Sequence, residues 1–112
     1  MFIENEIKKA PRQFKELCRM YDVELLYAFG SSVGSKRFDP DKSDIDLMVE
    51  LSEDDPLVRG ERLLSLWDAL ENFFRRKVDL LTKESLRNPY LIKSIENSKV
   101  LIYDGKSAEI LI

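Results

Sequence analysis

The sequence predicts an α/β (α+β) fold, in which a small mixed β-sheet carries helices packed on it. Helical and strand-like hydrophobic patterns alternate along the chain, and the strand-like stretches are short and rich in β-branched and aromatic residues. The length of 112 residues suits one domain. We therefore expect residues 1–112 to form a single domain around one hydrophobic core.

The first 29 residues are expected to contain a short helical turn, a helix and a strand. Ile3 and Ile7 belong to the turn, and Pro11 ends it. Pro11 also suits the first turn of the next helix, because its missing N–H needs no partner there. Apolar residues then recur at helical spacing before a β-branched and aromatic run that ends at Gly30. The expected segments are a helix at 11–21 and a strand at 23–29.

The remaining elements follow a small-residue turn at 30–35 and a polar loop at 36–42. Asp55 can cap the longest helix, and Pro56 can occupy its first position. A broad apolar stripe along that helix predicts that one of its faces is buried. The expected segments are strands at 43–51, 77–81 and 100–103, and helices at 56–75 and 89–97.

Composition excludes several classes of partner and location. The 18 basic and 21 acidic residues give a net charge of −3, so no basic excess points to direct nucleic-acid binding. No basic amphipathic stretch favours a membrane surface, and no apolar run approaches the roughly 18 residues of a membrane span. Acidic residues interrupt the N-terminal apolar residues, unlike a signal peptide. The expected location is the cytoplasm.

The residues that are missing limit the chemistry. The chain has no histidine and one cysteine, Cys18. This excludes a Ser-His-Asp triad, a Cys-His pair and histidine-ligated zinc or iron within the chain. Catalysis must therefore use carboxylates, hydroxyls, lysine, arginine, tyrosine or a hard metal ion.

Two carboxylates interrupt the second expected strand. Asp44 and Asp46 are two residues apart, and strand side chains alternate between faces, so both should project from one face. Ile45, Leu47 and Val49 should then face the core. Adjacent carboxylates repel each other when partly buried, and a divalent cation removes that repulsion. Mg²⁺ prefers oxygen ligands and is often held by one or two carboxylates together with substrate phosphates.

A third acid and a glycine turn complete the predicted site. If the strand containing Asp79 lies beside the second strand, Asp79 can join the acidic pair, and two metal ions could act on an in-line phosphoryl displacement. Gly30 allows the backbone to turn sharply and to approach a phosphate closely. The N–H groups of the turn and the Ser31 hydroxyl could hold the terminal phosphates.

These motifs carry a resemblance to a known family. Phe29-Gly30-Ser31, followed by Ser43-Asp44-Ile45-Asp46-Leu47, resembles the signature of the DNA polymerase beta-like nucleotidyltransferase superfamily. It is most similar to the small prokaryotic branch called minimal nucleotidyltransferases. The resemblance implies the nucleotidyltransferase fold and transfer of a nucleoside monophosphate, with AMP from ATP as the expected case and Mg²⁺ as cofactor. It implies phosphate binding at Gly30 and Ser31, and catalytic metal binding at Asp44, Asp46 and Asp79.

The resemblance also implies a partner. Members of this branch often act with a helical ribonuclease-like toxin of the HEPN type. In such pairs the nucleotidyltransferase is the antitoxin and can add AMP to a tyrosine of the toxin. We therefore expect a HEPN-type partner protein and a nucleoside triphosphate as the two binding partners.

The sequence departs from the family pattern at the turn. The usual form reads Gly-Ser-Arg-x-x-Gly, whereas Ser32 stands here at the arginine position. The stretch from Ser31 to Asp44 is also longer than usual. Lys36 or Arg37 could replace the missing arginine.

Two other functions are compatible with the same residues. The chain could be an antitoxin without catalysis that neutralises its partner by contact, an alternative that the missing arginine leaves open. It could also transfer a nucleotide to a small molecule, although such enzymes usually carry an additional domain. The three acids favour catalysis over the contact model.

Overall fold

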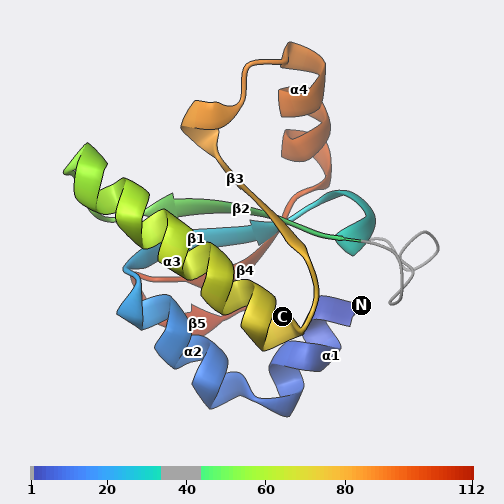
Figure 1. Cartoon of the computed structure of the whole chain (residues 1–112). Coiled ribbons are helices and arrows are strands. Elements are labelled where there is room, and N and C mark those ends of the chain that lie inside the picture. Colours follow the sequence, from blue (N-terminus) through green and yellow to red (C-terminus); the bar gives the residue numbers. More distant parts are fainter. Residues whose placement is uncertain (1, 34–43) are drawn as a thin grey trace.

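The computed structural model describes residues 2–33 and 44–112, apart from the side chain of Ser31. The polar loop expected at 36–42, the start of the strand expected at 43, and the residues Lys36 and Arg37 lie outside the described part. The described residues form a five-stranded sheet in the order β3-β2-β1-β4-β5, with helices on both faces (Figure 1). β2 and β3 are parallel, and every other neighbouring pair is antiparallel. The prediction of a small mixed sheet with packed helices is confirmed.

Proline starts three of the four helices in the described ranges. α2, α3 and α4 each have proline at the first helical turn, where no N–H partner is needed. Asp55 caps α3 as expected, because its Oδ1 accepts a hydrogen bond of 2.9 Å from the N–H of Leu57. Arg75, with φ 54°, ends the same helix in the left-handed conformation. The helices are α1 (Phe2–Lys9), α2 (Pro11–Met20), α3 (Pro56–Phe74) and α4 (Pro89–Ser98).

The strands agree with the expected segments to within two residues, with one addition. The short turn expected around Ile3 is a helix of eight residues, and two single-turn 3₁₀-helices, Gly30–Ser32 and Lys83–Ser85, separate longer elements. β5 was not predicted, because two residues are too few for a periodic pattern. The strands are β1 (Val23–Ala28), β2 (Ile45–Leu51), β3 (Val78–Thr82), β4 (Val100–Asp104) and β5 (Glu109–Ile110).

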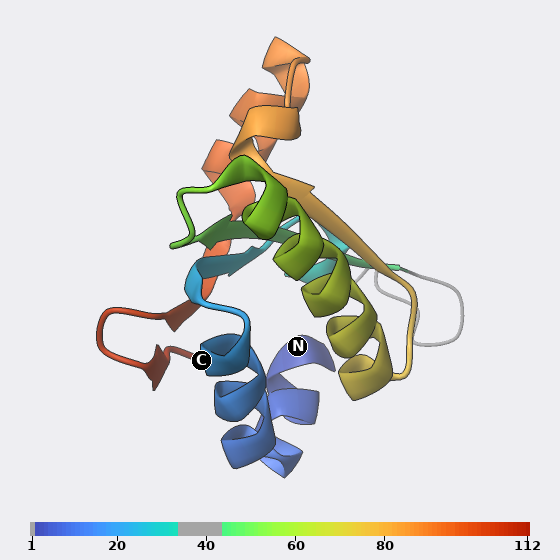
Figure 2. The same cartoon turned by 60° about the vertical axis from the view of Figure 1, so that its left-hand side comes forward.

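The two faces of the sheet are covered differently. α1, α2 and α3 lie on one face, and α4 lies on the other (Figures 1 and 2). As predicted, Ile45, Leu47 and Val49 are buried in the larger core, with 0–1% of their surface exposed. The α4 face has a smaller buried cluster made of Phe29, Met48 and Ile95. The second face therefore has the smaller buried cluster and is covered by a single α-helix.

No helix in the described ranges is long and apolar enough to cross a membrane.

Candidate active site

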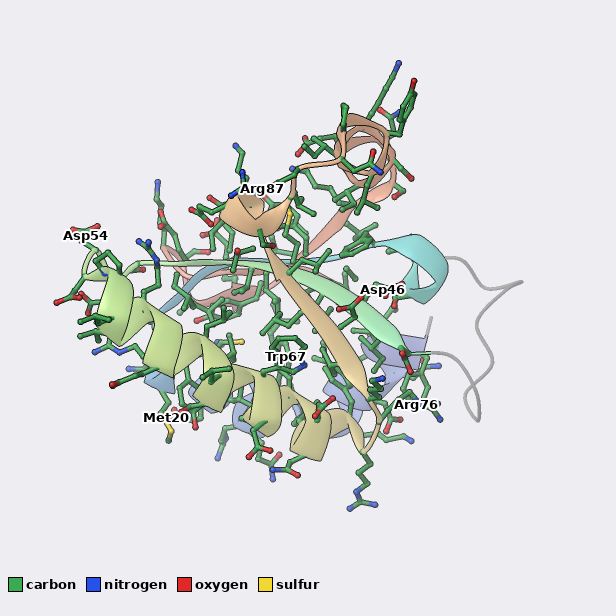
Figure 3. The ribbon with its side chains drawn as sticks, turned by 45° about the horizontal axis from the view of Figure 1, so that its top comes forward. Met20, Asp46, Asp54, Trp67, Arg76 and Arg87 are labelled. Atoms are coloured by element: carbon green, nitrogen blue, oxygen red, sulfur yellow. The ribbon has the colours of Figure 1, made fainter. Side chains whose placement is uncertain are left out.

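The sheet register brings two of the predicted acids together. β2 and β3 pair in parallel with Asp46 opposite Asp79. Neighbouring strands lie roughly 4.8 Å apart, and paired residues project to the same face. Both residues are near the beginning of their strands, where Asp79 is exposed. Asp46 is half-buried (Figure 3). The condition that the sequence left open for Asp79, a strand next to β2, is therefore met.

Asp44 lies just before β2 rather than inside it. The strand was expected to begin at residue 43, but the described ladder begins at Ile45, whose N–H donates to the carbonyl of Lys77 at 3.0 Å. Asp44 is exposed, two residues from Asp46. Because it precedes the ladder, strand pairing does not dictate where its side chain points, so the expected alternation does not by itself place Asp44 on the face of Asp46.

The site is electrostatically strained in the absence of a cation. Burial, followed by repulsion from Asp79 and from Asp44, raises the pKa of Asp46 to about 6. The other two acids of the predicted site therefore both act on the Asp46 carboxylate. A divalent cation would favour the charged form that burial and repulsion disfavour, so the donor set and its charge fit a hard metal ion.

The three carboxylates do not converge on one point. Within residues 2–33 and 44–112, no group of three or more acidic or cysteine side chains lies close enough to form a metal-ligand set. The register places Asp46 and Asp79 on paired positions, whereas the side chains of Asp44 and Asp79 are exposed. Binding a cation through all three acids would require side-chain rotation, which exposed aspartates can make at small cost.

Gly30 lies directly against Asp46. Its φ is +64°, in the left-handed region that favours glycine. A Cβ built on Gly30 would lie 2.6 Å from Oδ2 of Asp46, which is too close for any real contact. Gly30 therefore leaves the space that the Asp46 carboxylate occupies, a role different from the phosphate approach predicted for it.

Two hydrogen bonds attach the glycine turn to β2. The N–H of Phe29 donates to the carbonyl of Asp46 at 3.1 Å. The N–H of Asp46 donates to Oγ of Ser32 at 2.8 Å. The backbone of Ser31 lies between these residues in the 3₁₀-turn, and the hydroxyl predicted to hold phosphate lies outside the described part. The turn and the central acid thus form one unit.

Ser32 is the site residue whose role the sequence did not indicate. It was noted only as the residue that replaces the usual arginine, yet it is 2% exposed and bonded to Asp46. Its burial leaves no room for a long charged side chain without rearrangement. The one available signal was the departure from the family pattern, because nothing local connects Ser32 with a residue 14 positions later.

α3 holds the beginning of β3 in place. Nε1 of Trp67 donates to the carbonyl of Val78 at 2.6 Å, and Oε2 of Glu71 accepts from the N–H of Val78 at 2.9 Å. These bonds satisfy the outward backbone groups of an edge strand. Trp67 lies between α3 and β3 (Figure 3). The residue next to Val78 is Asp79, so the position of this acid depends on α3.

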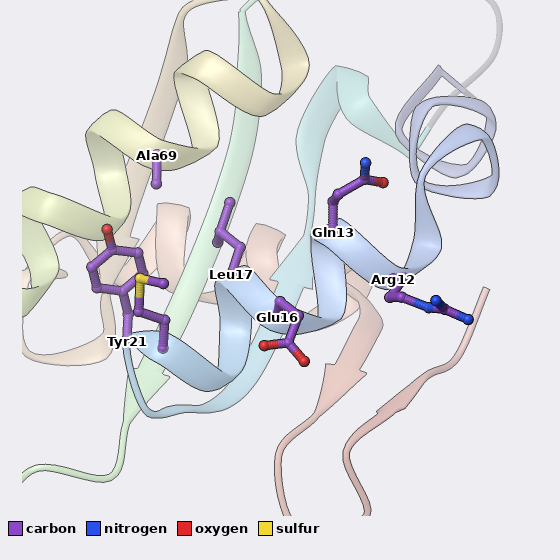
Figure 4. A pocket seen from close by; sticks show the side chains of 7 residues that line it. Arg12, Gln13, Glu16, Leu17, Tyr21 and Ala69 are labelled. Carbon is purple, nitrogen blue, oxygen red and sulfur yellow. The ribbon is translucent and has the colours of Figure 1, made fainter.

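A groove elsewhere on the molecule lacks this chemistry. It lies between α2 and α3 and is lined by residues that include Glu16, Leu17, Tyr21 and Ala69 (Figure 4). None of the predicted site residues lines it. The geometry of acids and glycine turn, rather than the depth of a groove, identifies the candidate site.

Sequence relatives match most of the chain. A model of the family described as "Nucleotidyltransferase domain" matches residues 10–102. Two proteins of Methanocaldococcus jannaschii, both described as "Putative protein adenylyltransferase", are 37% and 36% identical over 99 residues. Each match covers 88% of this chain and 96% of the relative.

Solved structures share the fold. A protein described as a "putative minimal nucleotidyltransferase" matches with a TM-score of 0.61 and 26% identity, over 85% of this chain and 92% of that chain. A chain of a toxin–antitoxin complex with AMP-PNP matches with a TM-score of 0.53 and 23% identity, over 87% of this chain and 80% of that chain. A chain of the complex of tri-AMPylated Shewanella oneidensis HEPN toxin with MNT antitoxin matches with a TM-score of 0.51 and 23% identity. This match covers 96% of this chain and 76% of that chain.

Proposed function

Since this chain belongs to the nucleotidyltransferase domain family, we propose that it transfers AMP from ATP to a hydroxyl of a partner protein, as the antitoxin of a pair with a HEPN-type toxin. The observation that carries the proposal is the pairing of Asp46 with Asp79 on adjacent parallel strands, beside the turn at Gly30. The naming of the relatives as protein adenylyltransferases supports protein as the acceptor.

The substrate and partner are proposed by similarity. One structural neighbour is a toxin–antitoxin complex with AMP-PNP, an ATP analogue, which favours ATP as the donor. Another contains a HEPN toxin carrying three AMP groups, which favours a toxin of that type as the acceptor. The absence of histidine from the chain leaves carboxylates as its natural groups for this chemistry.

The carboxylates divide into two roles. Asp44 and Asp46 would hold Mg²⁺, with Asp79 as a third ligand on the outer side. When bound, Mg²⁺ would neutralise phosphate charge and favour ionisation of the attacking hydroxyl. The acceptor oxygen attacks the α-phosphorus, the bond from that phosphorus to the bridging oxygen breaks, and pyrophosphate leaves. An oxygen of Asp79 accepts the proton of the attacking hydroxyl.

The glycine turn supports both roles. Gly30 leaves space for the Asp46 carboxylate, and the hydrogen bonds of Phe29 and Ser32 fix the backbone of Asp46 against the turn. Backbone N–H groups of the turn, with the hydroxyl of Ser31, would hold the terminal phosphates. Such preorganisation reduces the reorganisation needed in the transition state.

A transfer assay with matched variants tests the proposal. The protein is incubated with Mg²⁺, ATP labelled at the α-phosphate, and a HEPN-type protein as the partner. We expect label on the partner with the wild type and with Asp54→Asn, an exposed acid outside the site. Asp46→Asn and Asp79→Asn should each abolish labelling.

The same assay separates the alternatives. If Asp46→Asn neutralises the toxin as well as the wild type does and no label is transferred by either protein, the contact model replaces the enzymatic one. If label appears on a small molecule and never on the partner, the proposed acceptor is wrong.

A further inference from the structure

Lys99 stands at the end of a row of residues that crosses the sheet at the site. Asp79 pairs with Asp46, and the N–H of Phe29 bonds to the carbonyl of Asp46. On the other side of β1, Ala28 pairs with Val100, the first residue of β4, and Lys99 is the residue directly before it, at the end of α4. Two strand spacings of roughly 4.8 Å separate the backbones of Lys99 and Asp46.

The side chain of Lys99 lies on the same face as Asp46. Its Nζ is 4.5 Å from the ring centroid of Tyr27. Tyr27 pairs with Met48, which is two residues from Asp46 and therefore shares its face. α4 lies on this side of the sheet, where its Ile95 packs with Met48 (Figure 1). A positive charge thus lies on the face that contains the acids.

Lys99 is held more firmly than an ordinary surface lysine. Its side chain is 24% exposed, compared with 62% for Lys8 and 73% for Lys9. Its backbone N–H closes α4 by bonding to the carbonyl of Ile95 at 2.8 Å, and its Nζ lies 3.1 Å from Oε1 of Glu96. Glu96 is half exposed, so the pair is weak and can be exchanged for a stronger anion.

The geometry of in-line transfer indicates which part of the nucleotide would lie on the side of Lys99. The attacking and leaving oxygens lie on opposite sides of the reacting phosphorus. In the proposed function Asp79 takes the proton of the acceptor, and Asp79 is on the edge strand β3, so the acceptor would lie on that side of Asp46. The leaving pyrophosphate must then lie toward β1 and β4, where Gly30 and Lys99 are. Within the described ranges, no ion pair compensates the charges of Asp44, Asp46 or Asp79.

We propose that Lys99 binds the β- and γ-phosphates of the nucleotide and neutralises the pyrophosphate as it leaves. The inference rests on the proposed function, because it assigns a triphosphate to the same site. The ammonium exchanges Glu96 for a phosphate oxygen, which carries more charge and forms stronger hydrogen bonds. The entropic cost of ordering the Lys99 side chain is small, because the backbone of Lys99 is already fixed by its hydrogen bond at the end of α4.

Binding measurements on three variants test this role. Lys99→Gln keeps the length of the side chain and removes the charge. Lys93→Gln makes the same change at an exposed lysine of the same helix. Glu96→Gln breaks the ion pair but leaves the Lys99 charge. Affinities for AMP and for a non-hydrolysable ATP analogue are measured with Mg²⁺ by calorimetry, and circular dichroism verifies folding.

The proposal requires that Lys99→Gln lose affinity only for a ligand that has the terminal phosphates. Lys99→Gln should weaken binding of the analogue by about tenfold and leave AMP binding within about twofold. Lys93→Gln and Glu96→Gln should bind the analogue like the wild type or more tightly. Equal analogue affinity in Lys99→Gln and wild type overturns the role of Lys99 while leaving the proposed function standing.

Two other outcomes also decide the matter. If Glu96→Gln weakens analogue binding as much as Lys99→Gln does, the ion pair serves only the structure of α4, and the proposal is wrong. If the wild type binds neither AMP nor the analogue, both the role of Lys99 and the proposed function are overturned.

Discussion

Substituting Gly30 with alanine tests whether this residue makes room for the central acid. The new Cβ would lie 2.6 Å from Oδ2 of Asp46, but 3.5 Å from its Cγ and 3.7 Å from its Cβ. Only the outer end of the carboxylate clashes, so rotation of the Asp46 side chain relieves the contact. The backbone of Asp46, held by Phe29 and Ser32, should stay in place.

The expected magnitudes for stability and activity differ. A φ of +64° disfavours alanine relative to glycine by about 1 kcal/mol. Rotating a half-buried carboxylate adds about 1 kcal/mol or less. We therefore expect Gly30→Ala to lower the free energy of unfolding by about 1–2 kcal/mol. Activity should fall by about 100-fold, because a displacement near 1 Å in a reacting group has an effect of that size.

Gly60→Ala is the matched control. Gly60 lies in α3, and a Cβ there would meet nothing within 4 Å. Because alanine favours a helix over glycine, this variant should gain about 0.5–1 kcal/mol and keep wild-type activity. Stability is measured by urea denaturation, and activity by transfer of label from ATP. Transfer by Gly30→Ala within about threefold of the wild type would refute the reasoning, because the carboxylate would then not need the space.

Three further predictions follow from the contacts around Asp46 and Asp79. The pKa of Asp46 is raised to about 6 in the folded state, so the fold favours the neutral carboxyl. The stability that the neutral carboxyl contributes is therefore complete below about pH 4 and is lost as the pH rises through 6. Without metal, Asp46→Asn should therefore be more stable than wild type at pH 8 by about 1–2 kcal/mol, a value reduced for solvent screening, and equal to it near pH 4. Mg²⁺ should raise the melting temperature of the wild type and not of this variant. Thermal scans at pH 4 and pH 8 in which the wild type is the more stable protein at pH 8 would contradict the electrostatic account. Ser32→Ala removes the acceptor of the Asp46 N–H and should lower the free energy of unfolding by about 1–2 kcal/mol, as measured by urea denaturation. In steady-state kinetics, the change in kcat should be larger than the change in KM. Trp67→Phe removes the donor to the carbonyl of Val78 and should lower the free energy of unfolding by about 1 kcal/mol, with unchanged stability counting against this hydrogen bond.

Local signals in the sequence were sufficient for most elements. Pro11, Pro56 and Pro89 correctly predicted the starts of three helices, because the first turn is where proline fits. The alternation around β2 correctly predicted which side chains enter the core. Asp44 was placed inside the strand and lies before it, since alternation does not show where a ladder ends.

Residue types and motifs predicted the chemistry that is proposed for the site. Without histidine, the acids and the glycine turn were the favoured candidates, and they lie within residues 10–102, which the family model matches. The roles of Asp44, Asp46, Asp79, Gly30 and Ser31 are proposals that the variants above test. The role of Gly30 has changed most, because the structure adds a contact with Asp46 to the expected phosphate approach.

The sequence by itself determined the helices, the strands and the kind of chemistry, because these depend on neighbours a few residues apart. Only the tertiary structure decided which groups meet. The parallel pairing of β2 and β3 puts Asp79 opposite Asp46, 33 positions earlier, and Ser32 reaches Asp46 across a turn. Lys99 joins the same end of the sheet through β4. Such contacts depend on strand order and register, which arise from packing of the whole chain and leave no local pattern.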